Sequence, residues 1–442
     1  MTMSKEMMNL CEIVLKTAQD AGADDCRAIF VKRRFVEVQY REHKPEKVQE
    51  ASTQDIGIDI YVDGRYVSQN SADLRPGALK EFVRNAIEAA KLLEADPYRT
   101  LPDPKYYQGR KEIDLQMLDP DYQKVTPELR HAMAKELEES CLQAGGEKAI
   151  SVTSTVYDDY REESILTSNG FKGDIQSTIC YAFAQMTAQD EGDRRPNGYH
   201  YAVDRSFKKL PPCEEIGRRA AARTLELMGS KKLATQTLPI IIENQDVERV
   251  LDGFLGAMNG WALQQKRSFL LDKKGEKLGS DVFTLIDDPF IVGGLGSSLY
   301  DGDGFATRKR TMVEKGVLKD FYIDWYRSRK LGVEPTTGGT SNLLLPVGKR
   351  SVAEIMKDLG RGILINGFIG GNSNSNTGDF SIGITGTLFE NGELTQAVAE
   401  MNIADNHLKF WHKLAEAAND PWPYSNVQMP SLVFTDVVVA GV

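Results

Sequence analysis

One segment near the C-terminus concentrates small side chains that can form hydrogen bonds. Residues 370–381 read Gly-Gly-Asn-Ser-Asn-Ser-Asn-Thr-Gly-Asp-Phe-Ser, and apolar runs at 363–365 and 382–388 flank them. Amides and hydroxyls both donate and accept hydrogen bonds, so this loop could bind the backbone of an extended peptide or satisfy its own turns. No neighbouring base in the segment would activate a hydroxyl for attack. The residues alone favour a turn, and peptide binding is the functional alternative.

Acidic side chains in glycine-rich surroundings are the second group with possible chemistry. Asp301 and Asp303 flank Gly302, and Asp379 follows Gly378. Two carboxylates can catalyse hydrolysis when their surroundings separate their pKa values. Acidic residues in such loops are more often turn formers, and nothing in the spacing shows that these three converge.

Histidine is the commonest metal ligand and general base, but it is rare here. The five histidines are His43, His131, His200, His407 and His412. None stands in a zinc-binding signature, and we interpret all five as structural. The chain also lacks a phosphate-binding loop and a nucleophile-elbow motif. We therefore predict no catalytic residue, no metal site and no cofactor.

Composition narrows the functional classes further. The 442 residues are 41% hydrophobic and carry a formal net charge of -10, which argues against direct binding of nucleic acid. Five scattered cysteines without a C-x-x-C pair favour reduced thiols over disulfides. The longest uncharged run, residues 362–378, is too rich in Gly, Asn and Ser to span a bilayer. The N-terminus has no signal-peptide profile. We expect a cytoplasmic protein without a membrane segment.

The elements that must position these residues follow from periodicity. In the first half, apolar spacing predicts a helix from Met3 to about Gly22, and helices at 79–90, 127–145 and 213–228. Between them, strands are predicted at 27–38, 56–62, 65–69, 149–157, 163–167, 175–186 and 199–203. Asp63-Gly64 indicates a two-residue hairpin, and Thr126-Pro127 indicates a helix start. The order helix, strands, helix occurs twice, which we interpret as one extended α+β domain.

The second half of the sequence differs in that glycines separate most of its predicted elements. A short apolar strand at 238–242 precedes a helix at 246–258, and glycines then separate short β segments. Further helices are predicted at 351–360 and 405–418, and a last strand at 432–439. We expect an α+β protein with an N-terminal α+β domain, residues 1–230. The C-terminal domain, residues 231–442, should be mainly β, with a curved mixed or antiparallel sheet.

Several passages in the second half resemble the TldD/PmbA family, whose members are described as modulators of DNA gyrase and as metallopeptidases. The passages are residues 268–272, 287–289, 301–304, 316–318, 326–332, 377–381 and 389–393. They stand in the family's order and resemble its PmbA (TldE) branch. The first 230 residues match only in their order of elements.

The departures from the family bear on catalysis. The TldD branch carries H-E-x-x-x-H on the helix that here spans residues 246–260, and this helix contains no histidine. That branch also has a late cysteine, whereas this chain has none after Cys213. Hydrolytic zinc needs about three protein ligands, so the resemblance implies a metal-free PmbA-like member.

What the resemblance implies is a non-catalytic subunit that binds extended or unfolded peptides for a zinc-bearing, TldD-like partner. Any effect on gyrase would be indirect, through processing of peptides. Two alternatives remain open: a homodimeric peptide-binding protein without a protease partner, and a hydrolase based on Asp301, Asp303 and Asp379.

The expected peptide-binding residues come from the Asn/Ser loop. They are Asn372, Asn374, Asn376, Thr377, Gly378 and Asp379.

A second set is expected to have a structural or interface role. Arg327 and Arg329 could pair with Asp301 or Asp303 and hold the Asp/Gly loop against the following helix.

Overall fold

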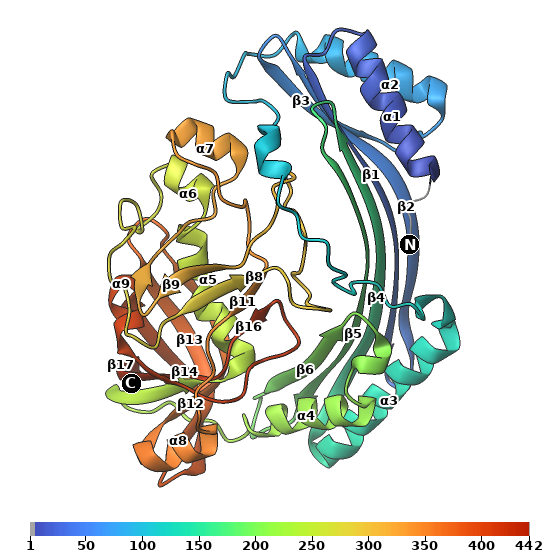
Figure 1. Cartoon of the computed structure of the whole chain (residues 1–442). Helices are drawn as coiled ribbons and strands as arrows, with labels where there is room; N and C mark the ends of the chain where they lie inside the picture. Colours follow the sequence, from blue (N-terminus) through green and yellow to red (C-terminus); the bar gives the residue numbers. More distant parts are fainter. Residues whose placement is uncertain (1–4, 442) are drawn as a thin grey trace.

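The alternating runs of the first half form one six-stranded antiparallel sheet with strand order β3-β2-β1-β4-β5-β6. A computed structural model describes residues 5–441 of the α+β chain (Figure 1). The strands of this sheet are β1 (Asp25–Arg41), β2 (Lys44–Val62), β3 (Arg65–Ser71), β4 (Ala149–Thr167), β5 (Lys172–Ala188) and β6 (Asn197–Asp204). Because β1 pairs with β4, the two repeated halves build a single sheet.

Four helices cover the convex face of this sheet. They are α1 (Lys5–Asp20), α2 (Pro76–Ala90), α3 (Pro127–Gly145) and α4 (Cys213–Leu225). Side chains such as Phe30 and Ile58 pack beneath α1 and α2, while Val38 and Ala182 pack beneath α3 and α4. The C-terminal half lies on the opposite, concave side (Figure 1).

A long linker between α2 and α3 runs between the sheet and the C-terminal half (Figure 1). It contains two short 3₁₀ turns, η1 (Pro104–Tyr107) and η2 (Tyr122–Lys124). Tyr107 from this linker, Phe171 from the first sheet and Tyr300 from the C-terminal half pack in one small apolar cluster. This cluster fixes one end of the concave face against the C-terminal half.

The C-terminal half is built on a curved mixed sheet with strand order β14-β13-β12-β7-β17-β15. Its strands are β7 (Gln236–Ile242), β12 (Arg361–Ser373), β13 (Asp379–Glu390), β14 (Glu393–Asn406), β15 (Leu414–Ala417) and β17 (Leu432–Ala440). β12 runs parallel to β7, and β14 also pairs with β17, so the sheet closes on itself like a barrel.

A smaller sheet and several helices complete this half. The sheet contains β8 (Leu285–Asp288), β9 (Arg310–Glu314), β10 (Val317–Leu318), β11 (Asn342–Leu344) and β16 (Val427–Gln428). The helices are α5 (Val247–Ala257), α6 (Gly260–Gln264), α7 (Trp325–Leu331), α8 (Val352–Leu359) and α9 (His407–Phe410). The remaining 3₁₀ turns are η3 (Gly146–Lys148), η4 (Phe207–Lys209), η5 (Asn244–Asp246) and η6 (Trp411–Lys413).

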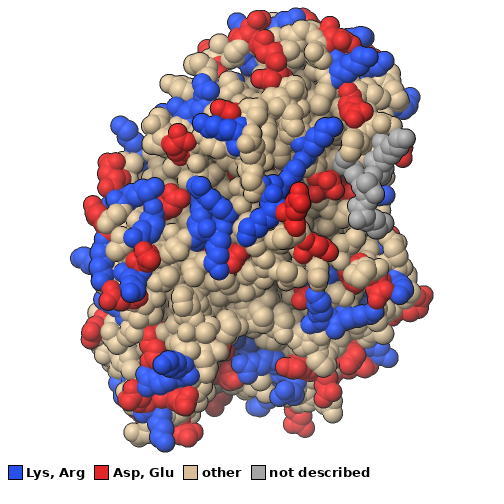
Figure 2. All heavy atoms as spheres, in the orientation of Figure 1, with Lys and Arg blue, Asp and Glu red and all other residues tan. Residues whose placement is uncertain are grey.

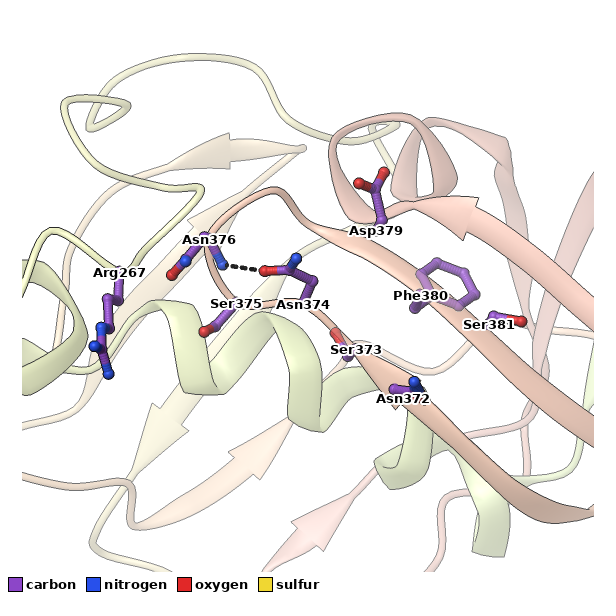
Figure 3. A pocket seen from close by; sticks show the side chains of 9 residues that line it. All are labelled: Arg267, Asn372, Ser373, Asn374, Ser375, Asn376, Asp379, Phe380 and Ser381. Carbon is purple, nitrogen blue, oxygen red and sulfur yellow. Dashed lines mark hydrogen bonds between the residues drawn. The ribbon is translucent and has the colours of Figure 1, made fainter.

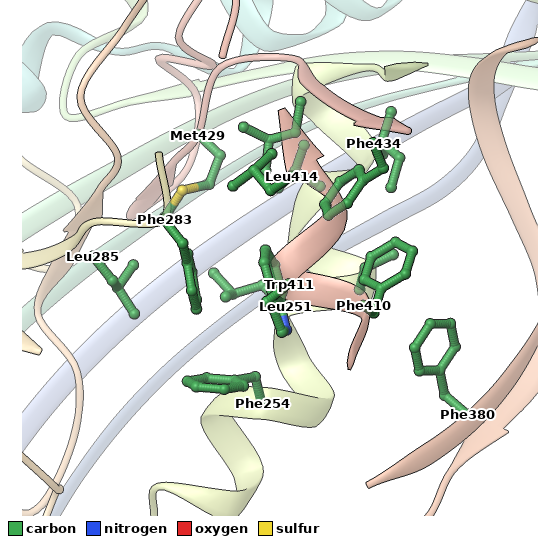
Figure 4. Packing of buried hydrophobic residues seen from close by; sticks show 14 of the residues in the cluster. Leu251, Phe254, Phe283, Leu285, Phe380, Phe410, Trp411, Leu414, Met429 and Phe434 are labelled. Carbon is green, nitrogen blue, oxygen red and sulfur yellow. The ribbon is translucent and has the colours of Figure 1, made fainter. Parts of the chain in front are cut away.

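An aromatic core holds α5 against both sheets (Figure 4). Trp411 stacks on Phe283 with ring centroids 4.3 Å apart, and Phe410 stacks on Phe434 at 4.2 Å. Phe254 of α5 meets Phe283 and Trp411 edge to face. Stacked and edge-to-face rings bury large apolar areas, so this core fixes the position of α5.

The helix predicted at residues 405–418 is present only at residues 407–413, where α9 and η6 lie, and both of its predicted ends are strands. β14 extends to Asn406 because it pairs with β13 there, and a single helical turn, α9, follows. Leu414–Ala417 then forms β15 against β17. Tertiary strand pairing overrides the local helical pattern in this segment.

Two further differences concern the first half. β4 is one continuous strand rather than two, and β2 begins at Lys44, twelve residues before the predicted start at Ile56. The extra part of β2 is highly polar and exposed, so it carries no hydrophobic alternation. Met3, where the first helix was predicted to begin, lies outside the described residues.

The chain passes from the first sheet to the second between α4 and β7, and we retain the proposal that the two domains divide near residue 230. In the described part of the chain, no helix has the length and apolar character needed to cross a membrane.

Candidate functional site

The Asn/Ser segment forms the end of the β12–β13 hairpin. The pairing of these strands shifts register between Ile369 and Asn372, where Gly370 and Gly371 both have positive φ. A Cβ on Gly371 would lie 2.6 Å from the Cα of Ile382, so only glycine fits this close approach. The bulge places the exposed residues 372–376 at the tip of the hairpin.

Part of the tip forms its own turn. The backbone N of Asn374 donates to the Asp379 carbonyl at 2.7 Å. Asn374 Oδ1 accepts a hydrogen bond from the backbone N of Asn376 at 2.9 Å (Figure 3). Thr377 Oγ1 donates to Asp379 Oδ2 at 2.7 Å, and Asn406 Nδ2 donates to Asp379 Oδ1 at 2.8 Å. Hydrogen bonds from Asn406 and Thr377 lower the pKa of Asp379, which keeps this carboxylate charged.

The tip lines an open cavity of about 650 Å³. Its lining residues are Arg267, Asn372, Ser373, Asn374, Ser375, Asn376, Asp379, Phe380 and Ser381 (Figure 3). Four of the six predicted binding residues thus face one hollow. Thr377 and Gly378 do not line it: Thr377 supports Asp379, and Gly378 packs against the ring of Phe269.

A second cavity of about 240 Å³ adjoins the first. Asn372 and Ser373 line both cavities, and the far wall of the second is the exposed side of α5, with Arg249, Asp252 and Gly253. The two hollows therefore lie on either side of the end of β12. Together they form a polar surface that runs from the hairpin tip to α5.

His407 lines this second cavity, a position that the sequence did not predict. Its Nε2 lies 3.2 Å from Ser373 Oγ, and its ring stacks on Phe269 at 5.5 Å. A Cβ on Gly253 would lie 2.4 Å from this Nε2, so glycine in α5 makes room for the imidazole. Burial lowers the pKa of His407 to about 4, so the ring is neutral at pH 7. Its predicted place on a long helix gave no signal of this position.

Asp301 and Asp303 hold the glycine-rich loop in place by accepting hydrogen bonds from backbone N–H groups. Asp301 Oδ1 accepts hydrogen bonds from the backbone N of Asp303 and of Phe305, each at 3.0 Å, and its Oδ2 accepts one from Gly338 N at 3.1 Å. Burial, and then the nearby Asp303 charge, raise the pKa of Asp301 to about 6. Asp303 Oδ2 accepts a hydrogen bond from Trp325 N at 2.9 Å, which joins the loop to the start of α7.

The predicted pairing of the arginines with these aspartates is wrong. Arg327 Nη1 pairs with Asp324 Oδ2 at 2.9 Å, on its own helix. Arg329 donates to the Pro97 carbonyl at 3.3 Å and to Thr100 Oγ1 at 3.5 Å, both in the linker. The loop is held against α7 as expected, but Asp303 and a backbone N–H form that contact.

Among the three aspartates of the hydrolase alternative, Asp379 lies on a different cavity from Asp301, and Asp303 lies beside Asp301 in the same loop. Asp379 lines the 650 Å³ hollow at the hairpin tip. Asp301 lines a separate cavity of about 190 Å³, and backbone amides occupy both of its oxygens. The structure places Asp301 beside Asp303, where backbone N–H groups bind both side chains, but it does not bring Asp379 to this pair.

Profiles of one family match three consecutive parts of the chain. Residues 26–90 match PmbA/TldA metallopeptidase domain 1, residues 120–228 its central domain, and residues 235–441 its C-terminal domain. The three profile matches cover both the helix-covered antiparallel sheet and the barrel-like mixed sheet. Fold and profiles therefore indicate the same class of protein, the PmbA/TldA metallopeptidase-like proteins. The chain belongs to the PmbA/TldD family.

Individual relatives agree with this assignment. The chain is 28% identical to metalloprotease PmbA of Escherichia coli over 95% of this chain and 93% of that protein. It is 27% identical to a PmbA homologue of Haemophilus influenzae over 99% and 96%.

Solved structures give the same result. A Bacteroides thetaiotaomicron protein described as a candidate modulator of DNA gyrase is 35% identical, with a TM-score of 0.96 and full coverage of both chains. TldE from Thermococcus kodakarensis has a TM-score of 0.87 at 22% identity, covering 98% of this chain and 100% of that chain, and shows the likeness of fold.

The metallopeptidase name implies a zinc ion, and the residues present do not fit one. α5 carries no histidine, and its exposed side near the hairpin instead presents Arg249, Asp252 and Gly253. Within residues 5–441, no group of three His, Cys, Asp or Glu side chains is placed to hold a metal ion. Zinc prefers such N, S and carboxylate donors, and a guanidinium beside the site would repel a cation.

Proposed function

We propose that this chain is a non-catalytic, metal-free subunit of a TldD/TldE-type proteolytic system that binds extended peptides in the cytoplasm. The observation that carries the proposal is the Asn/Ser hairpin tip, which lines a 650 Å³ cavity next to α5. In this system a zinc-bearing, TldD-like partner cleaves the peptide, and this chain holds it.

The chemistry of the tip suits recognition of a peptide backbone. In the described part of the chain, the side-chain amides of Asn372 and Asn376 have no hydrogen-bond partner, although both line the cavity. An amide offers two donors and an acceptor, which matches the alternating N–H and C=O groups of an extended chain. Main-chain hydrogen bonds give affinity with little dependence on peptide sequence.

The contact between Ser373 of β12 and His407 of α9 supports the non-catalytic part of the proposal. Ser373 and the neutral His407 form a contact, but the Nδ1 of His407 is buried without a partner in the described residues, so no carboxylate orients the ring. A nucleophile and base usually need such a third group. We therefore assign His407 a structural role.

The gyrase description of the Bacteroides relative fits an indirect effect. A net charge of -10 disfavours contact with DNA, so an effect on gyrase would arise from the processing of peptides. All five cysteines are buried free thiols, in keeping with a reducing compartment.

The test is peptide binding together with metal analysis of the purified chain. We expect a labelled unfolded peptide to bind with saturable fluorescence anisotropy, and zinc to be substoichiometric after mild chelation. Absence of binding, or about one tightly held zinc per chain, would refute the proposal. Sizing with and without a TldD-like protein separates a heterodimer from the alternative, a homodimer that works without a protease partner.

A further inference from the structure

We infer that an aromatic surface on the concave face of the N-terminal sheet binds the apolar and aromatic side chains of the extended peptide. The inference rests on the proposed function and adds a preference in substrate to it. The surface consists of Phe35, Tyr157, Tyr181, Phe183, Tyr199 and Tyr201, and we call it the aromatic stripe.

Strand register brings the six rings together. Tyr157 of β4 is directly opposite Tyr181 of β5, and Phe183 of β5 is directly opposite Tyr201 of β6. Opposite residues of an antiparallel pair point to the same face. Phe35 of β1 stands diagonally beside Tyr157, with ring centroids 6.2 Å apart. The stripe therefore crosses four neighbouring strands, of which β1 is far in sequence from the other three.

The stripe lies on the face that the helices leave open. Its residues alternate with Ala182, Ala184 and Ala202, which are buried under α3 and α4 on the other face. The six stripe residues keep part of their surface exposed, and Tyr199 is 38% exposed. A contiguous set of exposed aromatic rings on a folded protein usually marks an interaction surface.

The C-terminal half contacts the sheet at two places on its concave side. At one end, Phe171 and Tyr300 join the sheet to the C-terminal half, with ring centroids 5.1 Å apart. At the other end, Trp422 Nε1 donates to Tyr201 Oη at 3.2 Å, which brings a C-terminal loop to the end of the stripe. Figure 2 shows that the surface is hollowed between the lower part of the sheet and the C-terminal half, with Lys and Arg side chains along the lower rim of the hollow.

The spacing of the rings matches an extended chain. Neighbouring rings along β5 are 6.0 Å apart and those along β6 are 6.3 Å apart. Alternate side chains of an extended peptide repeat every roughly 6.6 Å, twice the rise of one residue. A peptide that runs along these strands can therefore place every second side chain against a ring.

The charges near the stripe select for uncharged side chains. Most of the ionic groups near the stripe are paired: Arg33 with Asp159, Glu37 with Lys47, and Arg223 with Asp246. Tyr157 Oη also donates to Asp159 Oδ2 at 2.8 Å. These pairs leave little net charge to attract an acidic or a basic side chain.

The experiment compares two labelled unstructured peptides of equal length. In one, phenylalanine alternates with serine; in the other, serine replaces every phenylalanine. The chain variants are Tyr199→Ser, the double variant Phe183→Ser with Tyr199→Ser, and the conservative Tyr199→Phe. Tyr98→Ser, which removes an exposed aromatic ring outside the stripe, is the control. Thermal unfolding of each variant verifies the fold, and Tyr199→Ser alone serves if the double variant unfolds.

We expect the double variant to bind the phenylalanine peptide about tenfold more weakly, because ring contacts each contribute a factor of a few. Binding of the serine peptide should not change, and Tyr199→Phe and Tyr98→Ser should behave like the unaltered chain.

If both peptides bind but the stripe variants bind them normally, this inference fails and the proposed function stands. If neither peptide binds the unaltered chain, both fail. A loss of self-association in the stripe variants, with peptide affinity unchanged, would identify a second copy as the occupant and overturn the inference.

Discussion

At the scale of single residues, the asparagines of the hairpin tip divide into two roles. Asn374 holds the turn through its Oδ1 and its backbone N, whereas Asn372 and Asn376 direct side chains to the cavity without partners in the described residues. The sequence showed a surplus of amides but could not separate these roles, because the separation depends on the bulge at Gly370 and Gly371.

This division predicts different effects for the three asparagines. Asn372→Ala with Asn376→Ala should weaken binding of an unfolded peptide about tenfold with little change in Tm, since two binding hydrogen bonds are lost. Asn374→Ala should lower the free energy of unfolding by about 1 kcal/mol, because the turn loses an acceptor. Anisotropy and urea denaturation measure the two effects, with Gln19→Ala on α1 as the control. Unchanged peptide affinity in the double variant would return the segment to a turn-forming role.

The buried ring of His407 should make the free energy of unfolding depend on pH. Burial lowers its pKa to about 4, from an ordinary value of 6.5, so the folded chain disfavours the protonated ring. The stability contributed by the neutral ring is present above pH 6.5 and is lost as the pH falls through 4. The difference in unfolding free energy between the unaltered chain and His407→Gln should therefore shrink by roughly 2 kcal/mol between pH 7 and pH 5.

Urea denaturation at the two pH values measures this difference. Gln19→Ala, an exposed substitution that removes no titratable group, should show no such convergence. A gap for His407→Gln that stays constant with pH would show that the ring titrates alike in the folded and unfolded chain.

At the scale of elements, local signals predicted the helices and turns with their own capping chemistry. Thr126 Oγ1 accepts a hydrogen bond from Leu129 N at the start of α3, and Ser351 with Glu354 forms a capping box on α8. Asp63 and Gly64 both have positive φ, as a two-residue hairpin requires. The helix prediction at 405–418 failed at both ends because these ends pair with β13 and β17, which lie outside the segment itself.

The junction between the Asp/Gly loop and α7 carries the next prediction. Asp303→Ala should destabilise the chain by about 1–3 kcal/mol, because it leaves the Trp325 N–H without its acceptor. Arg327→Ala should cost about 0.5 kcal/mol or less, since it removes a partly exposed pair within one helix. Chemical denaturation gives both values. A larger effect of Arg327→Ala than of Asp303→Ala would show that Arg327, rather than Asp303, holds the loop.

At the scale of the whole molecule, the concave sheet and the C-terminal half face each other across a hollow. Arg27 of β1 donates to the Gly302 carbonyl at 2.7 Å, and Tyr326 of α7 donates to Asp96 of the linker at 2.7 Å. These contacts fix the halves so that the hairpin tip and the aromatic stripe belong to one rigid frame. The strand pattern predicted the strands of the first sheet and a curved sheet in the second half, but not the separate five-stranded sheet. The stripe could not be predicted, because its rings meet only through register across β1, β4, β5 and β6.

The central claim, that this chain binds peptides but does not cleave them, has one direct test. A labelled unfolded peptide is incubated with the purified chain, with a zinc-bearing TldD-like protein, and with both, and the products are identified by mass spectrometry. We predict no cleavage by this chain alone and faster cleavage by the pair than by the partner alone. The gain should disappear when Asn372 and Asn376 are replaced by alanine. Zinc-dependent cleavage by this chain alone would contradict the account.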